Sequence, residues 1–194
     1  MKTIVTLALN PAIDKSASVA HVMAERKLYC QEPRFEPGGG GVNVARAIKK
    51  LGGESLLLYP TGGLTGTRLQ ELLSEERLNH RPFPIAGLNR ESLVVLEEAT
   101  GQQYRFVMPG PQLHQEEWEP FIRELASMEP APDYVVASGS LPPGVPSDFY
   151  AQIARAAKKR GAKVLVDVAG EALHEVLREG VFLLKPNIRE FREL

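Results

Sequence analysis

The sequence has 194 residues, of which 43 % are hydrophobic and 24 % charged, a composition typical of a soluble globular protein. Its 23 basic and 24 acidic residues nearly cancel, which excludes the strongly basic surface of a nucleic-acid or membrane-surface protein but not a local basic pocket. The single cysteine, Cys30, excludes an intramolecular disulfide, and no Cys/His set has zinc-ligand spacing. The amino terminus resembles a strand rather than a signal peptide, so we expect a cytoplasmic protein without nucleic-acid or membrane partners.

Strand-like and helix-like runs alternate along the chain. The predicted strands are residues 2–9, 55–59, 134–137, 163–166 and 181–184, and the predicted helices are residues 42–51, 66–76, 116–128, 148–160 and 172–179. We expect Ser147-Asp148 to cap the fourth helix and the last strand to be buried. The strands are continuously apolar rather than alternating, which predicts a parallel sheet with helices on both faces.

Two segments depart from this alternation. Residues 16–35 and 91–107 read as extended chain, and the second reads as a hairpin of strands 92–97 and 103–107 with a turn at 99–101. Their apolar residues fall on one side only, so these strands do not suit a parallel core. We expect a small secondary sheet that serves as a lid over a site or as an oligomer contact.

Polar residues follow the predicted strands, at the sheet edge where open α/β folds bind ligands. Of the four aspartates, Asp133 and Asp148 have ordinary strand-start and helix-start positions. Asp14 and Asp167 follow strands, and each suits either a functional role or a turn role.

A run of four glycines, residues 38–41, precedes the helix predicted at 42–51. Such a run lets the backbone approach a ligand beside a helix amino terminus, although a plain hinge is the alternative. It matches neither the dinucleotide fingerprint nor the Walker loop. Arg90, Arg105 and Lys27 lie in or beside the extended segments, where they suit either phosphate binding or solvated edge-strand charges.

The segment Gly39–Ala45, followed by Gly52 and Gly62, resembles the amino-terminal signature of the PfkB (ribokinase-like) family of carbohydrate kinases. The resemblance covers essentially the whole chain, and segments 35–48, 103–110, 138–145, 170–173 and 185–187 look most similar to the bacterial 6-phosphofructokinase branch. It implies a three-layer α/β/α fold with a mostly parallel sheet. Lid strands would be inserted at about 16–36 and 90–108. Residues 1–194 would form the amino-terminal portion of the kinase domain.

The resemblance also implies roles for individual residues. The sugar-phosphate site would be made of Asp14, Gly38, Gly39, Gly40, Gly41, Asn43, Arg90, Arg105 and Ser140, with Lys27 reaching in from a partner subunit. Asn187 and Glu190 match the Asn-x-x-Glu element that organises Mg²⁺ and nucleotide phosphates, with Lys185 and the Asp167 carboxylate nearby. The implied cofactors are ATP and Mg²⁺, with no direct metal ligand assigned, and the lid would form a homodimer contact.

The chain departs from the family pattern in two places. Asp167 is followed by Val168-Ala169-Gly170, where relatives more often carry hydroxyl residues. The Gly-Ala-Gly-Asp motif, which supplies the catalytic base and the anion hole, does not occur before Leu194. We therefore expect no catalytic base in these residues and little kinase activity from them alone. We also expect an exposed sheet edge that causes marginal solubility or self-association.

Three functions stay open at this point. The first is ATP-dependent phosphorylation of fructose 6-phosphate to fructose 1,6-bisphosphate, with these residues carrying the sugar-phosphate half. The second changes the substrate to fructose 1-phosphate or tagatose 6-phosphate. The third, from another class, is a non-catalytic module that binds sugar phosphate or dimerises through the lid.

Overall fold

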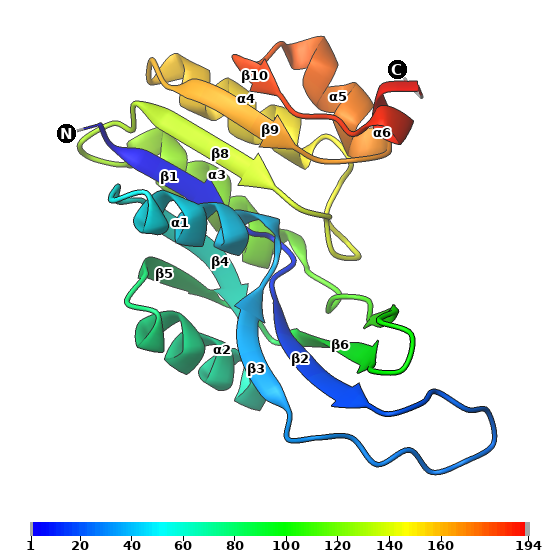
Figure 1. The fold of residues 1–194 in the computed structure, drawn as a ribbon. Helices are drawn as coiled ribbons and strands as arrows, with labels where there is room; N and C mark the ends of the chain where they lie inside the picture. The colour runs from blue at the N-terminus through cyan, green and yellow to red at the C-terminus, as the bar shows by residue number, and fades with distance from the viewer. Residues whose placement is uncertain (1, 193–194) are drawn as a thin grey trace.

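The computed structural model describes residues 2–192 and contains two sheets (Figure 1). The larger sheet has six parallel strands in the order β10-β9-β8-β1-β4-β5. Its strands are β1 (Ile4–Leu7), β4 (Leu56–Thr61), β5 (Asn79–Pro84), β8 (Tyr134–Ser138), β9 (Lys163–Asp167) and β10 (Leu183–Leu184). The helices are α1 (Gly40–Lys50), α2 (Gly63–Glu75), α3 (Gln115–Ser127), α4 (Phe149–Lys159), α5 (Glu171–Glu179) and α6 (Ile188–Arg192).

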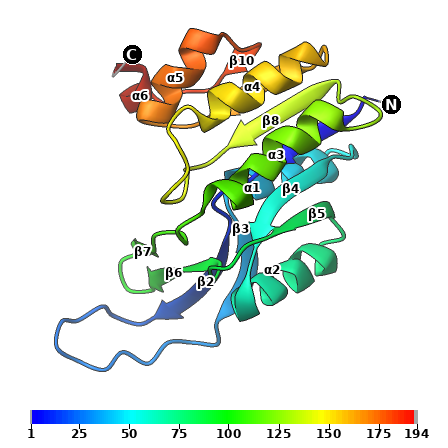
Figure 2. The same cartoon turned by 180° about the vertical axis from the view of Figure 1, so that it is seen from behind.

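We call the larger sheet and its helices the main body. Two hydrophobic cores lie on opposite faces of this sheet. One core joins the sheet to α1 and α2 through residues such as Val42 and Leu69. The other joins it to α3, α4 and α5 through residues such as Phe121, Ile153 and Val176. The two cores and the two opposite views (Figures 1 and 2) confirm the predicted parallel sheet with helices on both faces.

The smaller sheet, which we call the lid, has the order β3-β2-β6-β7. Its strands are β2 (Ala12–Val19), β3 (Arg34–Gly38), β6 (Arg90–Glu97) and β7 (Gln103–Val107). The β6–β7 hairpin is antiparallel, as predicted, and β2 pairs with β6 in parallel. The first extended segment is shorter in strand than predicted, because residues 20–33 form a loop that runs out to the far end of the lid (Figure 1).

The strand β5 was not predicted from the sequence. Half of its residues Asn79–Pro84 are polar and two others are prolines, so the segment shows neither the apolar run nor the alternation that predicts a strand. Proline is tolerated here because β5 is an edge strand, where a missing backbone N–H leaves no ladder partner unsatisfied.

The last strand is also corrected by the structure. Only Leu183 and Leu184 form β10, and they are not buried, with Leu183 46 % exposed. The reason is that β10 is the opposite edge strand of the sheet. The predicted exposed sheet edge is therefore confirmed.

The expected cap of α4 differs in its contacts. Asp148 does occupy the position before α4, but its carboxylate accepts a hydrogen bond from the Gln152 side chain rather than from a backbone N–H.

Within residues 2–192, no helix combines the length and the hydrophobicity needed to cross a bilayer.

Candidate functional site

The carboxylate of Asp14 lies where the lid joins the main body. Asp14 is on β2, half-buried, and its side chain leans over Gly38, so that a Cβ atom added to Gly38 would overlap the carboxylate. Burial raises the pKa of Asp14, and the charges of Arg90 and Arg46 partly oppose this shift. Asp14 is therefore a partly desolvated acceptor with arginines near it, suited to a ligand that carries hydroxyl groups.

Arg90 is the first residue of β6, and its side chain connects this strand to the loop after β1. Its Nε and Nη2 atoms donate to the carbonyl oxygen of Asn10 at 3.2 and 3.0 Å, and Nη1 donates to the Met108 carbonyl at 3.1 Å. The Asn10 amide donates to Ser140 Oγ at 3.0 Å. Asn10 thus links two expected phosphate-binding residues, Arg90 and Ser140, that lie 50 positions apart in the sequence.

Asn43 is exposed in the first turn of α1, and its amide oxygen accepts from Arg46 Nη1 at 2.7 Å. The same guanidinium donates to the Pro37 carbonyl at 2.6 Å and forms a two-point contact with Glu76 at 2.7 and 2.8 Å. Arg46 therefore ties the glycine run, the start of α1 and the end of α2 together.

The glycine run is required by close packing in this chain. Gly39 has φ +116°, which disfavours any other residue. A Cβ atom on Gly40 would overlap Ser138 Oγ, and one on Gly41 would overlap the Leu7 carbonyl. The start of α1 is thereby pressed against the carboxyl ends of β1 and β8, beside the expected ligand. A plain hinge does not explain these contacts.

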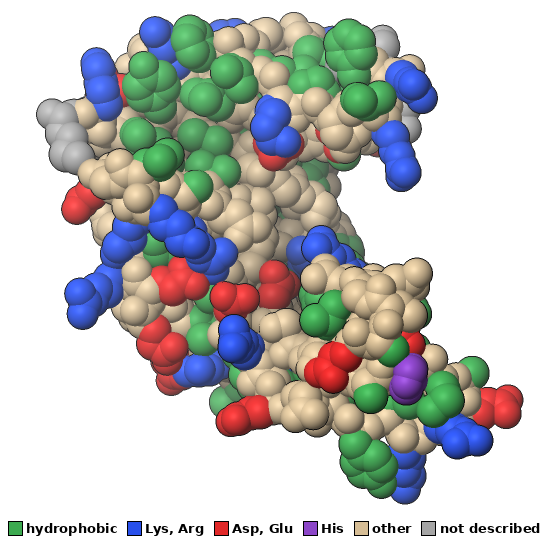
Figure 3. Space-filling model, viewed as in Figure 1, with side chains coloured by type: hydrophobic (Ala, Val, Ile, Leu, Met, Phe, Trp, Pro, Cys, Tyr) green, Lys and Arg blue, Asp and Glu red, His purple; other side chains and the backbone are tan. Residues whose placement is uncertain are grey.

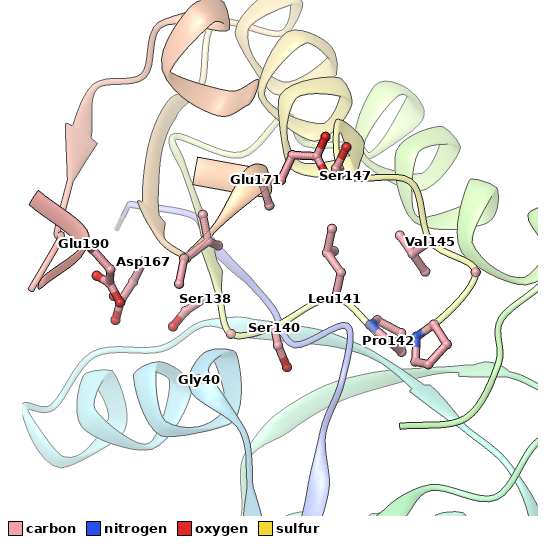
Figure 4. A pocket seen from close by; sticks show the side chains of 16 residues that line it. Gly40, Ser138, Ser140, Leu141, Pro142, Val145, Ser147, Asp167, Glu171 and Glu190 are labelled. Atoms are coloured by element: carbon pink, nitrogen blue, oxygen red, sulfur yellow. The ribbon is translucent and has the colours of Figure 1, made fainter. Parts of the chain in front are cut away.

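One cavity of about 820 Å³ extends along the carboxyl ends of β8 and β9 (Figure 4). Its wall includes Gly40 and Ser140 from the expected sugar side. It also includes Asp167 and Glu190 from the expected nucleotide side. The cavity thus connects two members of the expected sugar site with two members of the expected nucleotide site. Asp14, Asn43 and Arg90 are not part of its wall.

The nucleotide-side residues contact one another. Lys185 Nζ lies 3.1 Å from Asp167 Oδ1. Glu190 accepts from the backbone N–H and the amide of Asn187 at 2.8 and 2.6 Å, and Asn187 Oδ1 accepts from the backbone N–H of Glu190 at 3.0 Å. In this structure Asn187 and Glu190 therefore form a reciprocal cap at the start of α6.

Lys27 and Arg105 lie apart from this cluster. Lys27 is exposed in the loop 20–33, and Arg105 is exposed on the edge strand β7, where it donates to Gln103 at 3.2 Å. Figure 3 shows the hollow between the main body and the lid, with basic side chains at its rim. In the described chain, residues 2–192, no group of three or more His, Cys, Asp or Glu side chains could hold a metal ion.

Sequence reasoning did not single out Asn10 or Arg46. The position of Asn10 after the first predicted strand could have identified it as a candidate site residue. In the structure its buried Oδ1 has no hydrogen-bond partner among residues 2–192. Arg46 gave no signal, because it lies within a helix and its partner Glu76 is 30 positions away.

The chain is similar to known sugar-phosphate kinases. Residues 4–194 match the family described as pfkB family carbohydrate kinase. The ATP-dependent 6-phosphofructokinase isozyme 2 of Mycobacterium tuberculosis is 45 % identical over 98 % of this chain and 56 % of its own length. The crystal structure of phosphofructokinase-2 from Escherichia coli in complex with fructose-6-phosphate has a TM-score of 0.94 and 42 % identity, over 100 % of this chain and 64 % of that one.

A tagatose-6-phosphate kinase of Staphylococcus epidermidis is less similar, with 33 % identity over 98 % of this chain and 62 % of its own length. The chain thus spans between 56 % and 64 % of the length of these three proteins.

Proposed function

Because the chain belongs to the pfkB family of carbohydrate kinases, we propose that it carries the sugar-phosphate-binding half of an enzyme that phosphorylates fructose 6-phosphate with ATP. The product is fructose 1,6-bisphosphate. The 6-phosphofructokinases of M. tuberculosis and E. coli, at 45 % and 42 % identity, support this substrate over tagatose 6-phosphate and fructose 1-phosphate.

The single observation that carries the proposal is the continuous cavity from Ser140 and Gly40 to Asp167 and Glu190. Phosphoryl transfer depends mainly on positioning and on stabilising charge, so the two substrates need adjoining sites with fixed polar groups. A cavity with a sugar side and an acidic side supports this arrangement better than it supports a lone binding module.

On the sugar side, Asp14 accepts hydrogen bonds from sugar hydroxyl groups, because its ionised carboxylate has only acceptor sites. Arg90 uses three of its five N–H groups on the Asn10 and Met108 carbonyls, and the N–H groups left on Nη1 and Nη2 donate to the phosphate of the substrate. Ser140 adds a hydroxyl. Arg105 closes over the phosphate from β7. The glycine run lets the α1 backbone approach the sugar.

On the acidic side, the residues present fit Mg²⁺ with nucleotide phosphates. Mg²⁺ is held in proteins through one or two carboxylates together with phosphate oxygens, and Asp167 and Glu190 supply two carboxylates on one cavity wall. ATP supplies the transferred phosphoryl group when it is bound. Lys185 neutralises negative charge at this end, since its ammonium already lies beside Asp167. We assign no general base among residues 2–192.

We also propose that two chains pair through the lid in the cytoplasm, with Lys27 of one chain completing the sugar-phosphate site of the other. The exposed position of Lys27 on the loop at the far end of the lid supports this assignment. One similar crystal structure is described as the tetrameric inhibited form of phosphofructokinase-2 from E. coli, so a related protein does assemble.

Calorimetric titration of this chain with fructose 6-phosphate tests the proposal. We expect saturable binding that is weakened about 10- to 100-fold by Asp14→Asn or Arg90→Gln, since each removes a hydrogen bond to a charged group. The matched control is Asp148→Asn, which alters an aspartate that precedes α4 and pairs with Gln152, away from the lid strands that carry Asp14 and Arg90, and we expect it to leave the affinity unchanged. Tighter binding of tagatose 6-phosphate or fructose 1-phosphate would change the substrate, and no binding of any of the three would overturn the proposal.

A further inference from the structure

A buried carboxylate that the proposed reaction does not use lies in the lid. Glu97 is the last residue of β6, and it is 7 % exposed. Burying a carboxylate is unfavourable unless hydrogen bonds replace its water. Its partners therefore indicate what the side chain holds in place.

Three donors from three segments converge on this carboxylate. The backbone N–H of Val22 donates to Oε1 at 2.9 Å, Thr100 Oγ1 donates to Oε2 at 2.8 Å, and Tyr104 OH donates to Oε2 at 3.2 Å. These hydrogen bonds, with Val22 the largest contributor, lower the pKa of Glu97. His21 Nδ1 lies 4.0 Å away.

Val22 is the donor that does not belong to the β6–β7 hairpin. It lies at the start of the loop 20–33, which carries Lys27 five positions later. Before Val22, the carbonyl of Ala20 accepts from the backbone N–H of Ala99 in the hairpin turn at 3.2 Å. After Val22, the next hydrogen bond to another segment, within residues 2–192, is donated by Gln31 N to the Ser18 carbonyl at 2.8 Å. The hydrogen bond between Val22 and Glu97 is therefore the last one that holds the loop before Lys27.

We propose that Glu97 is a positioning residue for sugar-phosphate binding, which fixes the loop 20–33 to the hairpin and so presents Lys27. The consequence for binding rests on the proposed function, whereas the attachment of the loop does not. A simple hairpin cap would need only Thr100 and Tyr104, and it would not direct one carboxylate oxygen to the separate loop.

Hydrogen–deuterium exchange of the whole chain tests the attachment. Glu97→Gln keeps the shape of the side chain but removes its charge, and Glu97→Ala removes the acceptor. We expect exchange of the Val22 amide, followed by NMR, to be about tenfold faster in Glu97→Gln, and faster again in Glu97→Ala, because hydrogen bonds to charged groups are about twice as strong as neutral ones. Unchanged protection of β1 shows that the variants still fold.

Two matched controls separate the loop from the hairpin. Tyr104→Phe removes one hairpin donor, and Glu98→Gln changes the neighbouring carboxylate, which accepts from Ser18 Oγ at 2.6 Å on β2. Both should leave exchange of the Val22 amide unchanged. If Glu97→Gln accelerates exchange only in residues 98–104, Glu97 is a hairpin cap and the proposal is wrong.

The effect on binding is measured by calorimetry with fructose 6-phosphate. We expect Glu97→Gln to weaken binding roughly 2- to 10-fold, the cost of ordering a mobile side chain on binding, and Glu98→Gln to leave it unchanged. In a Lys27→Ala background, Glu97→Gln should cause no additional loss, because the two changes act through one group. Additive losses would overturn the positioning role. If the unaltered chain binds no sugar phosphate, the proposed function fails, while the exchange measurement still decides the attachment.

Discussion

The guanidinium of Arg46 donates to the amide oxygen of Asn43 at 2.7 Å, and this contact fixes which way the Asn43 amide faces. With its oxygen already engaged, the exposed Asn43 amide keeps its NH₂ group as a donor, while Asp14 on β2 carries acceptor oxygens. Under the proposed function, the two side chains would supply opposite hydrogen-bonding groups to the sugar hydroxyls.

We predict that Arg46→Gln destabilises the protein and weakens sugar-phosphate binding. The ion pair with Glu76 is about three-quarters shielded from solvent, with the two side chains 23 % and 28 % exposed. Its loss should cost about 1–3 kcal/mol in the free energy of unfolding, measured by urea denaturation. Calorimetry should show weaker binding of fructose 6-phosphate, because Asn43 loses its support.

The matched control for this prediction is Arg68→Gln. Arg68 also contacts two glutamates, Glu71 and Glu75, but all three lie on α2 and are at least 44 % exposed. Exposed pairs contribute little, so we expect no measurable change in the free energy of unfolding and unaltered binding. Equal effects of Arg46→Gln and Arg68→Gln would contradict a special role for Arg46.

Gly38→Ala should impair binding more than stability. The added methyl group would overlap the Asp14 carboxylate, which is the mobile end of a side chain, so the carboxylate rather than the backbone moves away. We expect a loss of affinity for fructose 6-phosphate of about tenfold or more, since a hydrogen bond to a charged group is displaced. The unfolding midpoint should change little.

Gly53→Ala provides the comparison for Gly38→Ala. Its Cβ atom would meet the Ile48 side chain at 3.0 Å and the Ile48 carbonyl oxygen at 3.3 Å, with no contact to Asp14. Affinity should stay unchanged in this variant. If Gly38→Ala binds as well as Gly53→Ala does, Asp14 is not a sugar ligand in the position described.

The free energy of unfolding should decrease as the pH is lowered, because of His80. Its Nδ1 atom lies 2.9 Å from Tyr59 OH, and its Nε2 atom lies 3.1 Å from Ser74 Oγ. Burial raises the pKa of Tyr59, so the phenol stays protonated and donates to Nδ1. Burial also lowers the pKa of His80 from its ordinary 6.5.

The sign follows from proton binding in the two states. Below pH 6.5 the unfolded chain binds a proton at His80 before the folded chain does, so the free energy of unfolding decreases as the pH falls from 6.5 toward the folded-state pKa. Urea denaturation at pH 7.5 and pH 5.5 measures this decrease. We expect a smaller decrease in His80→Gln, whereas His174→Gln, at an exposed position of α5, should behave like the unaltered protein.

The alternation of apolar strands and helices predicted most of the main body because each of those strands is buried on at least one face. It failed at the two edges of the sheet, where β5 contains prolines and β10 is exposed, because edge strands need neither continuous hydrophobicity nor every backbone donor. In the site, Asp14 and Asp167 were identifiable by their places after strands. Arg46 and Glu97 were not, because their roles depend on partners brought near only by the fold.

Among residues 2–192, the face of the main sheet that carries α1 is incompletely covered, and we predict that this face drives self-association of the 194-residue chain. Beside α1, a groove of about 320 Å³ is lined by apolar residues only: Ile4, Val44, Ile48, Tyr134, Val136 and Leu165. Figure 3 shows hydrophobic side chains gathered over this part of the sheet. Contiguous apolar surface of this kind favours contact with another molecule.

Leu165→Lys should therefore lower the association measured by sedimentation velocity over a range of concentrations. A charge placed in the groove must be desolvated before a second molecule can cover it, which opposes the contact. The matched change is Leu88→Lys, which replaces a leucine that is 61 % exposed in the loop between β5 and β6. Neither residue lies on a lid strand, so the lid pairing proposed above would persist in both variants, and the comparison between the two variants isolates the contribution of the groove. If they sediment alike, the uncovered face does not bind a second molecule.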